Sequence, residues 1–368
     1  MFRKKIQSYF KFYIQRIFIL IYGKINTIQF NNTNNDKITE ITQVKSDTYP
    51  DKGYFLYEIK NGRIYTDMHQ NVSIINKDNI LSEASFQHVN NQFQKVSFNS
   101  ALINGTPKLK KKFKGTIFNL TQGSSGNNYF HFIFDIVPKI FLLEQKTLVS
   151  SIDYFYVPEI KSWQKEIFLL LNIDEKKLID SKRYQHIEGD LIIATSHPWY
   201  FKGDFQSETK NIPEWIVKLN RNKFLPLAKK FNNNTKVFLD RSSSNYNHCQ
   251  IENINEVMDF FKRKGFTIYK PEELNIKEQI YLFNHASIIA GAHGAAFTNT
   301  IFCKPSTKII EIIPKSHPSK KCERISEILN LNYYKIRVKD NNINKNFPNR
   351  IFLTDKNLKE ISDITDLY

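Results

Sequence analysis

The stretch IIAGAHGAAFTN at residues 288–299 decides how the second half of this 368-residue chain is expected to fold. An apolar strand enters a turn of glycine and alanine, and a short helix follows at once. Small residues let another group approach the backbone, and free N–H groups at a helix start attract anions. Gly291, His293 and Gly294 are therefore candidate ligand contacts, with His293 able to donate to a phosphate oxygen. An ordinary tight turn with a solvated histidine is the alternative.

The segments on both sides continue this pattern, because short apolar strands alternate with helical periodicity. Such alternation predicts a parallel sheet with helices on both faces and a ligand at the carboxyl ends of its strands. The expected strands lie at 237–239, 267–269, 288–290 and 309–313, and the expected helices at 254–261 and 276–284.

Three more side chains of this half could contact a ligand. Arg241 and Ser242 follow the strand at 237–239, so they should emerge at the same sheet edge as His293. Arg241 offers a planar fork for two phosphate oxygens and Ser242 a neutral donor; the alternative is a surface arginine beside a serine-rich turn, which is the commoner fate of arginine. Glu311 stands among isoleucines, where an unpaired carboxylate is costly, so we expect a ribose diol or a lysine as its partner.

The first half also has an α/β pattern, so the whole chain is predicted to be α/β with two stacked Rossmann-like domains. Strands are expected at 117–118, 154–157 and 191–195, and a helix at 163–171. FLYEIK and RIYTD flank Asn61-Gly62, which predicts a hairpin with a tight turn. The polar segment 224–235, with its run of asparagines, is the expected boundary.

The run NYFHFIFDIVP at 128–138 holds a second group of polar side chains. His131 and Asp135 are four residues apart, so on a helix they share a face. Asp135 could take a proton from a hydroxyl while His131 positions it. Pro138 disfavours a regular helix through Phe134 and marks a kink or a helix start. The alternatives are a capping Asp135 and a core His131 among phenylalanines.

Composition narrows the classes of partner. The chain has 53 Lys and Arg against 36 Asp and Glu, and its net charge of +17 suggests an anionic partner such as nucleic acid, a phospholipid surface or a phosphate-bearing small molecule. A hydrophobic content of 41% excludes a mostly disordered chain. The lysines are scattered and no nucleic-acid module is recognisable, which argues against a specific nucleic-acid partner. Three scattered cysteines favour a reducing compartment.

The first 24 residues, MFRKKIQSYFKFYIQRIFILIYGK, are basic and apolar. Their apolar runs are far shorter than the roughly 20 residues that cross a bilayer, and Lys11, Gln15 and Arg16 interrupt a secretory signal. As a helix, this segment would gather apolar side chains on one side. It could then lie on a membrane surface or pack on the protein itself.

No known phosphate or metal motif occurs in the chain. G-x-x-x-x-G-K-[ST], H-E-x-x-H, G-x-S-x-G, zinc-type spacing and Asp-x-Asp are all missing from the sequence. Phosphate would then be neutralised by backbone amides, Arg241 and His293. We therefore expect no metal and no other cofactor.

Taken together, four segments resemble glycosyltransferase family 61, in the order and spacing of that family. They are NYFHFIFDIVP at 128–138, LDRSSSN at 239–245, EQIYLF at 278–283 and GAHGAAFTN at 291–299, and the resemblance runs from about residue 115 to about 315. The chain departs from the family at Cys249-Gln250, where a basic pair is common, and this leaves the donor identity open.

The resemblance implies a metal-independent, inverting transferase of the GT-B kind, with two Rossmann-like domains facing a central cleft. A nucleotide sugar, expected to be UDP-linked, would donate to a hydroxyl of a glycan or lipid-linked glycan in capsular or other surface polysaccharide biosynthesis. The implied roles are Asp135 as base with His131 beside it, Arg241, Ser242, Gly291, His293 and Gly294 near the diphosphate, Gln279 and Asn299 near the donor cleft, and Glu311 at the ribose.

The expected organisation follows from the resemblance. It consists of an amphipathic basic segment (1–30), an acceptor-side α/β domain (31–230), a nucleotide-sugar-binding Rossmann-like domain (231–340) and a tail (341–368) that could pack back on the N-terminal domain. We expect a cytoplasmic enzyme, peripheral on the inner face of the plasma membrane through residues 1–24. Two other hypotheses remain: a basic protein that binds nucleic acid or anionic surfaces, and a catalytically inactive scaffold relative.

Overall fold

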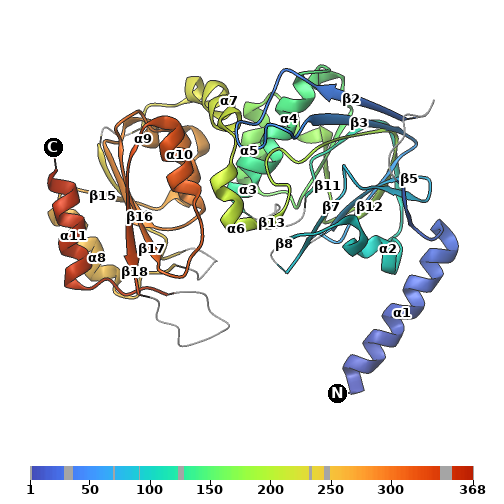
Figure 1. The fold of residues 1–368 in the computed structure, drawn as a ribbon, viewed down its shortest axis with the longest axis horizontal. Coiled ribbons are helices and arrows are strands. Elements are labelled where there is room, and N and C mark those ends of the chain that lie inside the picture. Colours follow the sequence, from blue (N-terminus) through green and yellow to red (C-terminus); the bar gives the residue numbers. More distant parts are fainter. Residues whose placement is uncertain are drawn as a thin grey trace. The chain divides into compact units, whose positions relative to one another are not determined.

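The computed structural model describes residues 2–28, 36–68, 71–90, 92–122, 128–231, 234–243, 249–339 and 350–367 (Figure 1). They belong to two compact units, Met1–Phe205 and Gln206–Tyr368. This division lies before the expected boundary at 230/231, because α7 (Glu214–Phe224) packs against η8 (Ala295–Phe302) of the second unit. Residues 244–245 of the LDRSSSN segment lie outside the described residues.

Unit 1 is built on a sheet of 13 strands among the described residues, ordered β11-β10-β9-β12-β4-β5-β7-β8-β13, with β1, β2, β3 and β6 beside this path. The strands are β1 (Asn26–Ile28), β2 (Asp36–Ile41), β3 (Tyr54–Lys60), β4 (Arg63–Thr66), β5 (Asn71–Asn76), β6 (Asn79–Leu81), β7 (Phe86–Val89), β8 (Gln92–Phe93), β9 (Lys111–Asn119), β10 (Tyr154–Val157), β11 (Leu178–Asp180), β12 (His186–Thr195) and β13 (Gly203–Asp204).

This sheet is mixed, whereas the sequence predicts a Rossmann-like first domain. Strands β9 to β12 pair in parallel, and β12 pairs antiparallel with β3 and β4 on its other side. The α/β prediction is therefore confirmed in the coarser sense of a mixed α/β fold. The helices of this unit are α1 (Phe2–Tyr22), η1 (Val96–Phe98), α2 (Ser100–Asn104), α3 (Tyr129–His131), η2 (Phe132–Ile136), α4 (Val137–Glu144), η3 (Val149–Ser151), α5 (Ser162–Leu170) and η4 (Glu175–Lys177), with α6 (Phe205–Glu208) at the junction.

The predicted hairpin around Asn61-Gly62 is wrong. Strands β3 and β4 do not pair with each other, because both pair antiparallel with successive parts of β12. Asn61 has the positive φ of 52° that the motif favours, yet its N–H donates to the carbonyl of Asp190. A Cβ on Gly62 would lie 2.9 Å from Ile192, so the chain bends along β12 instead of folding back.

Unit 2 contains a parallel five-stranded sheet in the order β15-β14-β16-β17-β18, as the β-α alternation predicts. Helices α8 and α11 pack on one face, where Phe238, Phe261, Ile310 and Ile361 share a core, and α9, α10 and η8 lie over the other (Figure 1). The strands are β14 (Lys236–Leu239), β15 (Thr267–Tyr269), β16 (Ile288–Ala292), β17 (Lys308–Pro314) and β18 (Asn332–Val338). The remaining helices are η5 (Thr209–Asn211), η6 (Leu225–Leu227), α8 (Ile254–Arg263), η7 (Pro271–Glu273), α9 (Ile276–His285), α10 (Lys321–Leu329) and α11 (Asp355–Asp366).

The described part of the C-terminal tail packs within unit 2. Helix α11 contacts β18, and Ile361 enters the core beside Ile336. Ile351 pairs with Ile251 in a parallel bridge. The apolar side of α11 thus covers the same sheet face as α8, whereas the sequence suggested packing on the N-terminal domain.

Candidate active site

The segment that carries His131 and Asp135 is a helix with an irregular turn. Asn128 caps its start by accepting from the N–H of Phe130 at 2.9 Å. The turn η2 has π-helical bonding, and α4 follows with Pro138 in its first turn. Proline has no N–H to offer the carbonyl four residues earlier, so the chain widens by one residue before it. The predicted pairing face is therefore present, and Pro138 marks both the irregular turn and the start of α4.

Asp135 is completely buried and uses both carboxylate oxygens. Oδ2 lies 2.8 Å from Nδ1 of His131, and Oδ1 accepts from Nε1 of Trp199 at 2.8 Å. His131 keeps 8% of its surface exposed, whereas Asp135 keeps none. Because the carboxylate accepts, Nδ1 carries the imidazole proton and Nε2 holds the free electron pair. In this pair the histidine, not the carboxylate, can meet a solvent-borne hydroxyl.

Other buried polar groups surround this pair. Nδ1 of His197 accepts the N–H groups of Trp199 and Tyr200, and its Nε2 lies 2.6 Å from Nε2 of Gln122. Burial lowers the pKa of His197 to about 3, against the opposing charge of Asp135. Burial also lowers the pKa of Lys139 to about 8, although Asp135 favours its charged form. Asp135 thus lies among buried basic side chains whose charged forms burial disfavours.

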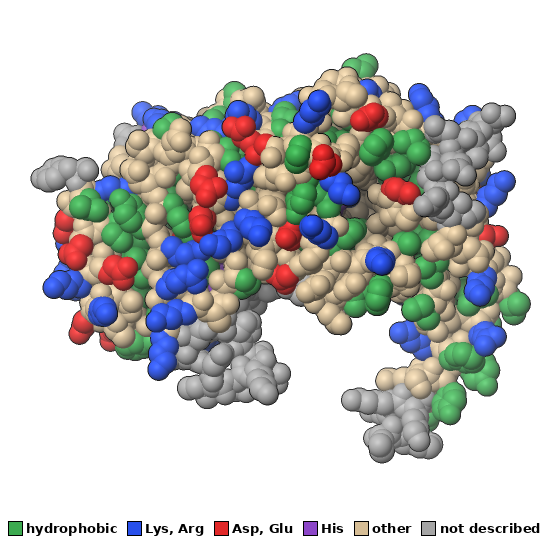
Figure 2. Space-filling model, in the orientation of Figure 1, with side chains coloured by type: hydrophobic (Ala, Val, Ile, Leu, Met, Phe, Trp, Pro, Cys, Tyr) green, Lys and Arg blue, Asp and Glu red, His purple; other side chains and the backbone are tan. Residues whose placement is uncertain are grey.

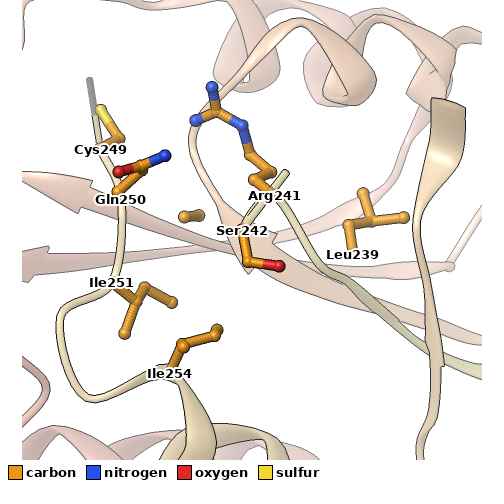
Figure 3. A pocket seen from close by; sticks show the side chains of 8 residues that line it. Leu239, Arg241, Ser242, Cys249, Gln250, Ile251 and Ile254 are labelled. Atoms are coloured by element: carbon orange, nitrogen blue, oxygen red, sulfur yellow. The ribbon is translucent and has the colours of Figure 1, made fainter. Parts of the chain in front are cut away.

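In unit 2, a pocket of about 210 Å³ opens at the carboxyl ends of β14 and β16 (Figure 3). Connections from β14 run first to β15 on one side and later to β16 on the other, so this is the point where the strand order reverses. Parallel α/β sheets bind ligands at that point. The walls are partly apolar, from Leu239, Ile251, Ile254 and Ala292, and partly polar, from Arg241, Ser242 and Gln250, with Cys249 beside them.

Two cations meet the turn that follows β16. Arg241 donates from Nη1 to the carbonyl of His293, and Lys321 donates to the carbonyl of Gly294 at 2.8 Å. A Cβ on Gly294 would lie 2.5 Å from the Arg241 guanidinium, so glycine is needed for this close approach. Burial lowers the pKa of both Arg241 and Lys321. The predicted neighbours Arg241, His293 and Gly294 are therefore brought together, with Lys321 added.

His293 is held by a buried carboxylate from the adjacent strand. Its Nδ1 lies 2.5 Å from Oε1 of Glu311, which also accepts from Cys322, while Oε2 accepts from Tyr333 at 2.5 Å. Burial lowers the pKa of His293 to about 4. For Glu311, burial raises the pKa, but the charge and hydrogen bond of His293 with the bonds from Cys322 and Tyr333 outweigh it and lower the pKa to about 2. The lysine expected as the partner of Glu311 is thus replaced by three protein donors, and contact of Glu311 with a ribose stays a prediction.

The same residues offer a geometric test for a metal site. Ligand atoms of His293, Glu311 and Cys322 all lie within 4.8 Å of one another. Two ligands of a tetrahedral zinc ion stand about 3.3 Å apart, given bond lengths near 2.0 Å. The 2.5 Å between Nδ1 and Oε1 is instead a hydrogen-bond distance. This cluster is a bonded network that fixes His293.

The remaining predicted residues lie in the same unit and bond mainly within it. Gln279 donates to the carbonyls of Pro271 and Leu274 and accepts from Asn299 at 2.8 Å, which ties α9 to η8. Contact of these two amides with a donor stays a prediction. Gly291 pairs with Leu239 across β14 and β16, where a Cβ would lie 3.0 Å from the Leu239 carbonyl. Ser242 donates to Asp240, which fixes the turn after β14.

Several contributors were missed in the sequence. Trp199 lies 64 residues from Asp135, and Tyr333 lies 22 residues from Glu311, so no local spacing in the sequence predicts these two contacts. The ring of His317 lies close to that of His293, with centroids 4.3 Å apart and planes tilted by 50°. Lys321 carries a weak signal, because a lysine in the first turn of a helix opposes the helix dipole and suggests a specific partner.

Comparison with known proteins supports the assignment of this chain to the glycosyltransferases. Residues 129–310, close to half of the chain, match the family model described as Glycosyltransferase 61. The chain belongs to glycosyltransferase family 61. It is also 35% identical over 65 residues to a protein of Oryza sativa subsp. japonica named beta-1,2-xylosyltransferase RCN11. That match covers 18% of this chain and 12% of the rice protein.

Proposed function

We propose that this chain is an inverting glycosyltransferase that moves a sugar from a nucleotide sugar, expected to be UDP-linked, to a hydroxyl of a glycan or lipid-linked glycan of a surface polysaccharide. Family membership supports the class of reaction. The observation that carries the proposal is the combination of His293, Arg241 and Lys321 around the turn at the strand-end pocket of unit 2.

The donor diphosphate is assigned to this turn. Two cations and an imidazole there can attract an anion, and partial burial strengthens each interaction. Glu311 accepts from Nδ1 of His293, so Nε2 can donate to a phosphate oxygen only after it takes up a proton, which the negative charge of the diphosphate favours. The partly apolar walls beside Gln250 suit the uncharged part of the donor. Glu311 is in this scheme a positioning residue for His293.

The acceptor is activated by the pair in unit 1. Nε2 of His131 takes the proton of the acceptor hydroxyl, whose oxygen attacks the anomeric carbon as the bond to the phosphate oxygen breaks. The electron pair leaves with the nucleoside diphosphate, and the configuration inverts. Asp135 orients His131 and stabilises the imidazolium through the bond at 2.8 Å. This refines the expectation that Asp135 is itself the base.

The proposal includes a GT-B arrangement, in which the two units face each other across a cleft that receives donor and acceptor. It also includes catalysis without a metal, because Arg241 and Lys321 supply positive charge for the departing diphosphate. Turnover is therefore expected to continue in EDTA.

The donor site is tested by calorimetric titration of the purified chain with a panel of UDP-sugars in EDTA. Arg241→Ala should weaken binding about 10- to 100-fold, the size of a lost charge-assisted contact. Arg337→Ala, an exposed arginine of the same unit, is the matched control and should bind like the wild type. Failure of every sugar nucleotide to bind, or equal affinity of Arg241→Ala and wild type, contradicts the site. Binding without donor hydrolysis or transfer to any glycan acceptor would favour the inactive scaffold.

A further inference from the structure

Helix α1 presents an apolar stripe to solvent. Leu20 is 86% exposed and Phe10 is 68% exposed, although both are large apolar side chains. A scattered exposed hydrophobic residue is common, but a continuous stripe on one helix face indicates an interaction surface. The stripe residues follow one another at helical spacing along the same face: Ile6, Phe10, Tyr13, Ile17, Leu20 and Ile21.

The contacts of α1 with the rest of unit 1 come from other faces of its last turns. Ile19 lies against Gly105, where a Cβ would be 2.7 Å from Ile19 Cγ1. The hydroxyl of Tyr22 accepts from the N–H of Lys110 at 3.1 Å, and its ring meets His186 edge-on at 5.0 Å. The helix is thus anchored at its C-terminal end and projects from the strands of the unit (Figure 1). Contacts with the described residues of unit 1 leave the stripe exposed.

The charge of α1 has one sign. Its sequence, FRKKIQSYFKFYIQRIFILIY, contains lysines and arginines but no aspartate or glutamate. With about 100° of rotation per residue, the exposed Lys11 and Arg16 fall on the two flanks of the stripe. Figure 2 shows apolar and basic side chains together along this projecting helix. A second copy of α1 would bring like charges together, whereas anionic headgroups complement them.

Among the described residues, no helix is both long enough and apolar enough to cross a membrane. We propose that α1 lies in the surface of an anionic phospholipid bilayer, with the stripe inserted among the acyl chains and the flanking basic groups at the headgroups. The anchor at Tyr22 then holds unit 1 at the membrane. This inference does not depend on the transfer chemistry, because binding to vesicles needs neither donor nor acceptor.

The test measures co-sedimentation of the full chain with vesicles of phosphatidylcholine alone or with about 30% phosphatidylglycerol. Phe10→Gln removes an aromatic ring from the stripe, and Phe12→Gln removes the same ring, 49% exposed, from a face more than 100° away. Phe10→Gln should weaken binding to the anionic vesicles at least about tenfold, and Phe12→Gln by less than about threefold. Neither position is in the folded core, and circular dichroism confirms the fold.

Binding that requires phosphatidylglycerol, decreases with salt and separates these two variants supports the proposal. The proposal is overturned if the chain does not bind anionic vesicles, if it binds neutral vesicles equally well, or if Phe10→Gln and Phe12→Gln lose the same affinity. Sedimentation velocity gives the remaining outcome. A concentration-dependent dimer that Phe10→Gln abolishes, without vesicle binding, assigns the stripe to a second copy of the chain instead.

Discussion

Each unit holds a histidine whose Nδ1 is bonded to a buried carboxylate, but the two pairs are built differently. His131 and Asp135 are four residues apart on one irregular helix. His293 and Glu311 are 18 residues apart and meet because Gly291 pairs with Glu311 in neighbouring parallel strands. The first pair follows from local sequence, whereas the second exists only in one sheet register.

The surroundings of the two histidines differ as well. Aromatic rings lie beside His131, with the centroid of Phe205 4.4 Å away, and Trp199 donates to Asp135. His293 instead shares its turn with Arg241 and Lys321. An aromatic setting suits proton transfer from a neutral hydroxyl, while a cationic turn suits an anion. The same pair thus fits two roles according to its neighbours.

The largest expected effect separates these roles. Asp135→Asn should keep the geometry but offer Nδ1 of His131 an amide, which favours the tautomer with the proton on Nε2. The base would then be lost, and kcat should fall about 10²- to 10⁴-fold with donor affinity unchanged. Steady-state kinetics and calorimetry measure the two quantities. His285→Gln, a histidine outside both pairs, is the control, and an unchanged kcat in Asp135→Asn would remove the pair from the mechanism.

Glu311→Gln is expected to affect stability as well as donor binding. The amide cannot accept from His293, Cys322 and Tyr333 together, so at least one buried donor is left unpaired, at a cost of about 1–3 kcal/mol. Thermal unfolding should show this loss. Glu323→Gln on α10 gives up only partly exposed contacts to lysines and should cost less than about 1 kcal/mol. Equal losses would mean that the network around Glu311 carries little stability.

The pH dependence of stability tests the environment of His293. Its pKa is lowered from 6.5 to about 4, so between these pH values the unfolded chain binds a proton at this histidine that the folded chain does not bind. The contribution of the neutral His293 to the free energy of unfolding is complete above pH 6.5 and is lost between about pH 6.5 and 4. The loss is about 2 kcal/mol at pH 5. Denaturant unfolding at pH 7.5 and 5 should show a smaller difference in His293→Gln. His197→Gln is the corresponding variant in unit 1. If both variants show the same difference in unfolding free energy between pH 7.5 and 5 as the wild type, the two histidines are not buried in the neutral form.

What the sequence could predict depends on the range of the interaction. The strand, turn and helix around Gly291 and the pairing face of His131 and Asp135 are confirmed, because both arise within a few residues. The protein partners of Glu311 were missed, since strand alternation points its side chain away from the core of Ile310 and Ile312 toward residues that only the register identifies. The hairpin at Asn61 failed for the same reason, because β12 offers both flanking strands a better partner.

The smallest expected effect concerns the glycine of the donor turn. Gly294 has an extended backbone, so Gly294→Ala adds no backbone strain, and its Cβ must displace the Arg241 guanidinium 2.5 Å away. We expect a roughly tenfold loss of UDP-sugar affinity, about 1.4 kcal/mol, with little change in melting temperature. Because the loss acts through Arg241, adding Gly294→Ala to Arg241→Ala should cost almost nothing further. Calorimetric titration of the wild type, the two single variants and the double variant completes this double-mutant cycle. Strictly additive losses would show that the glycine admits the donor itself and that the cation and the turn act independently.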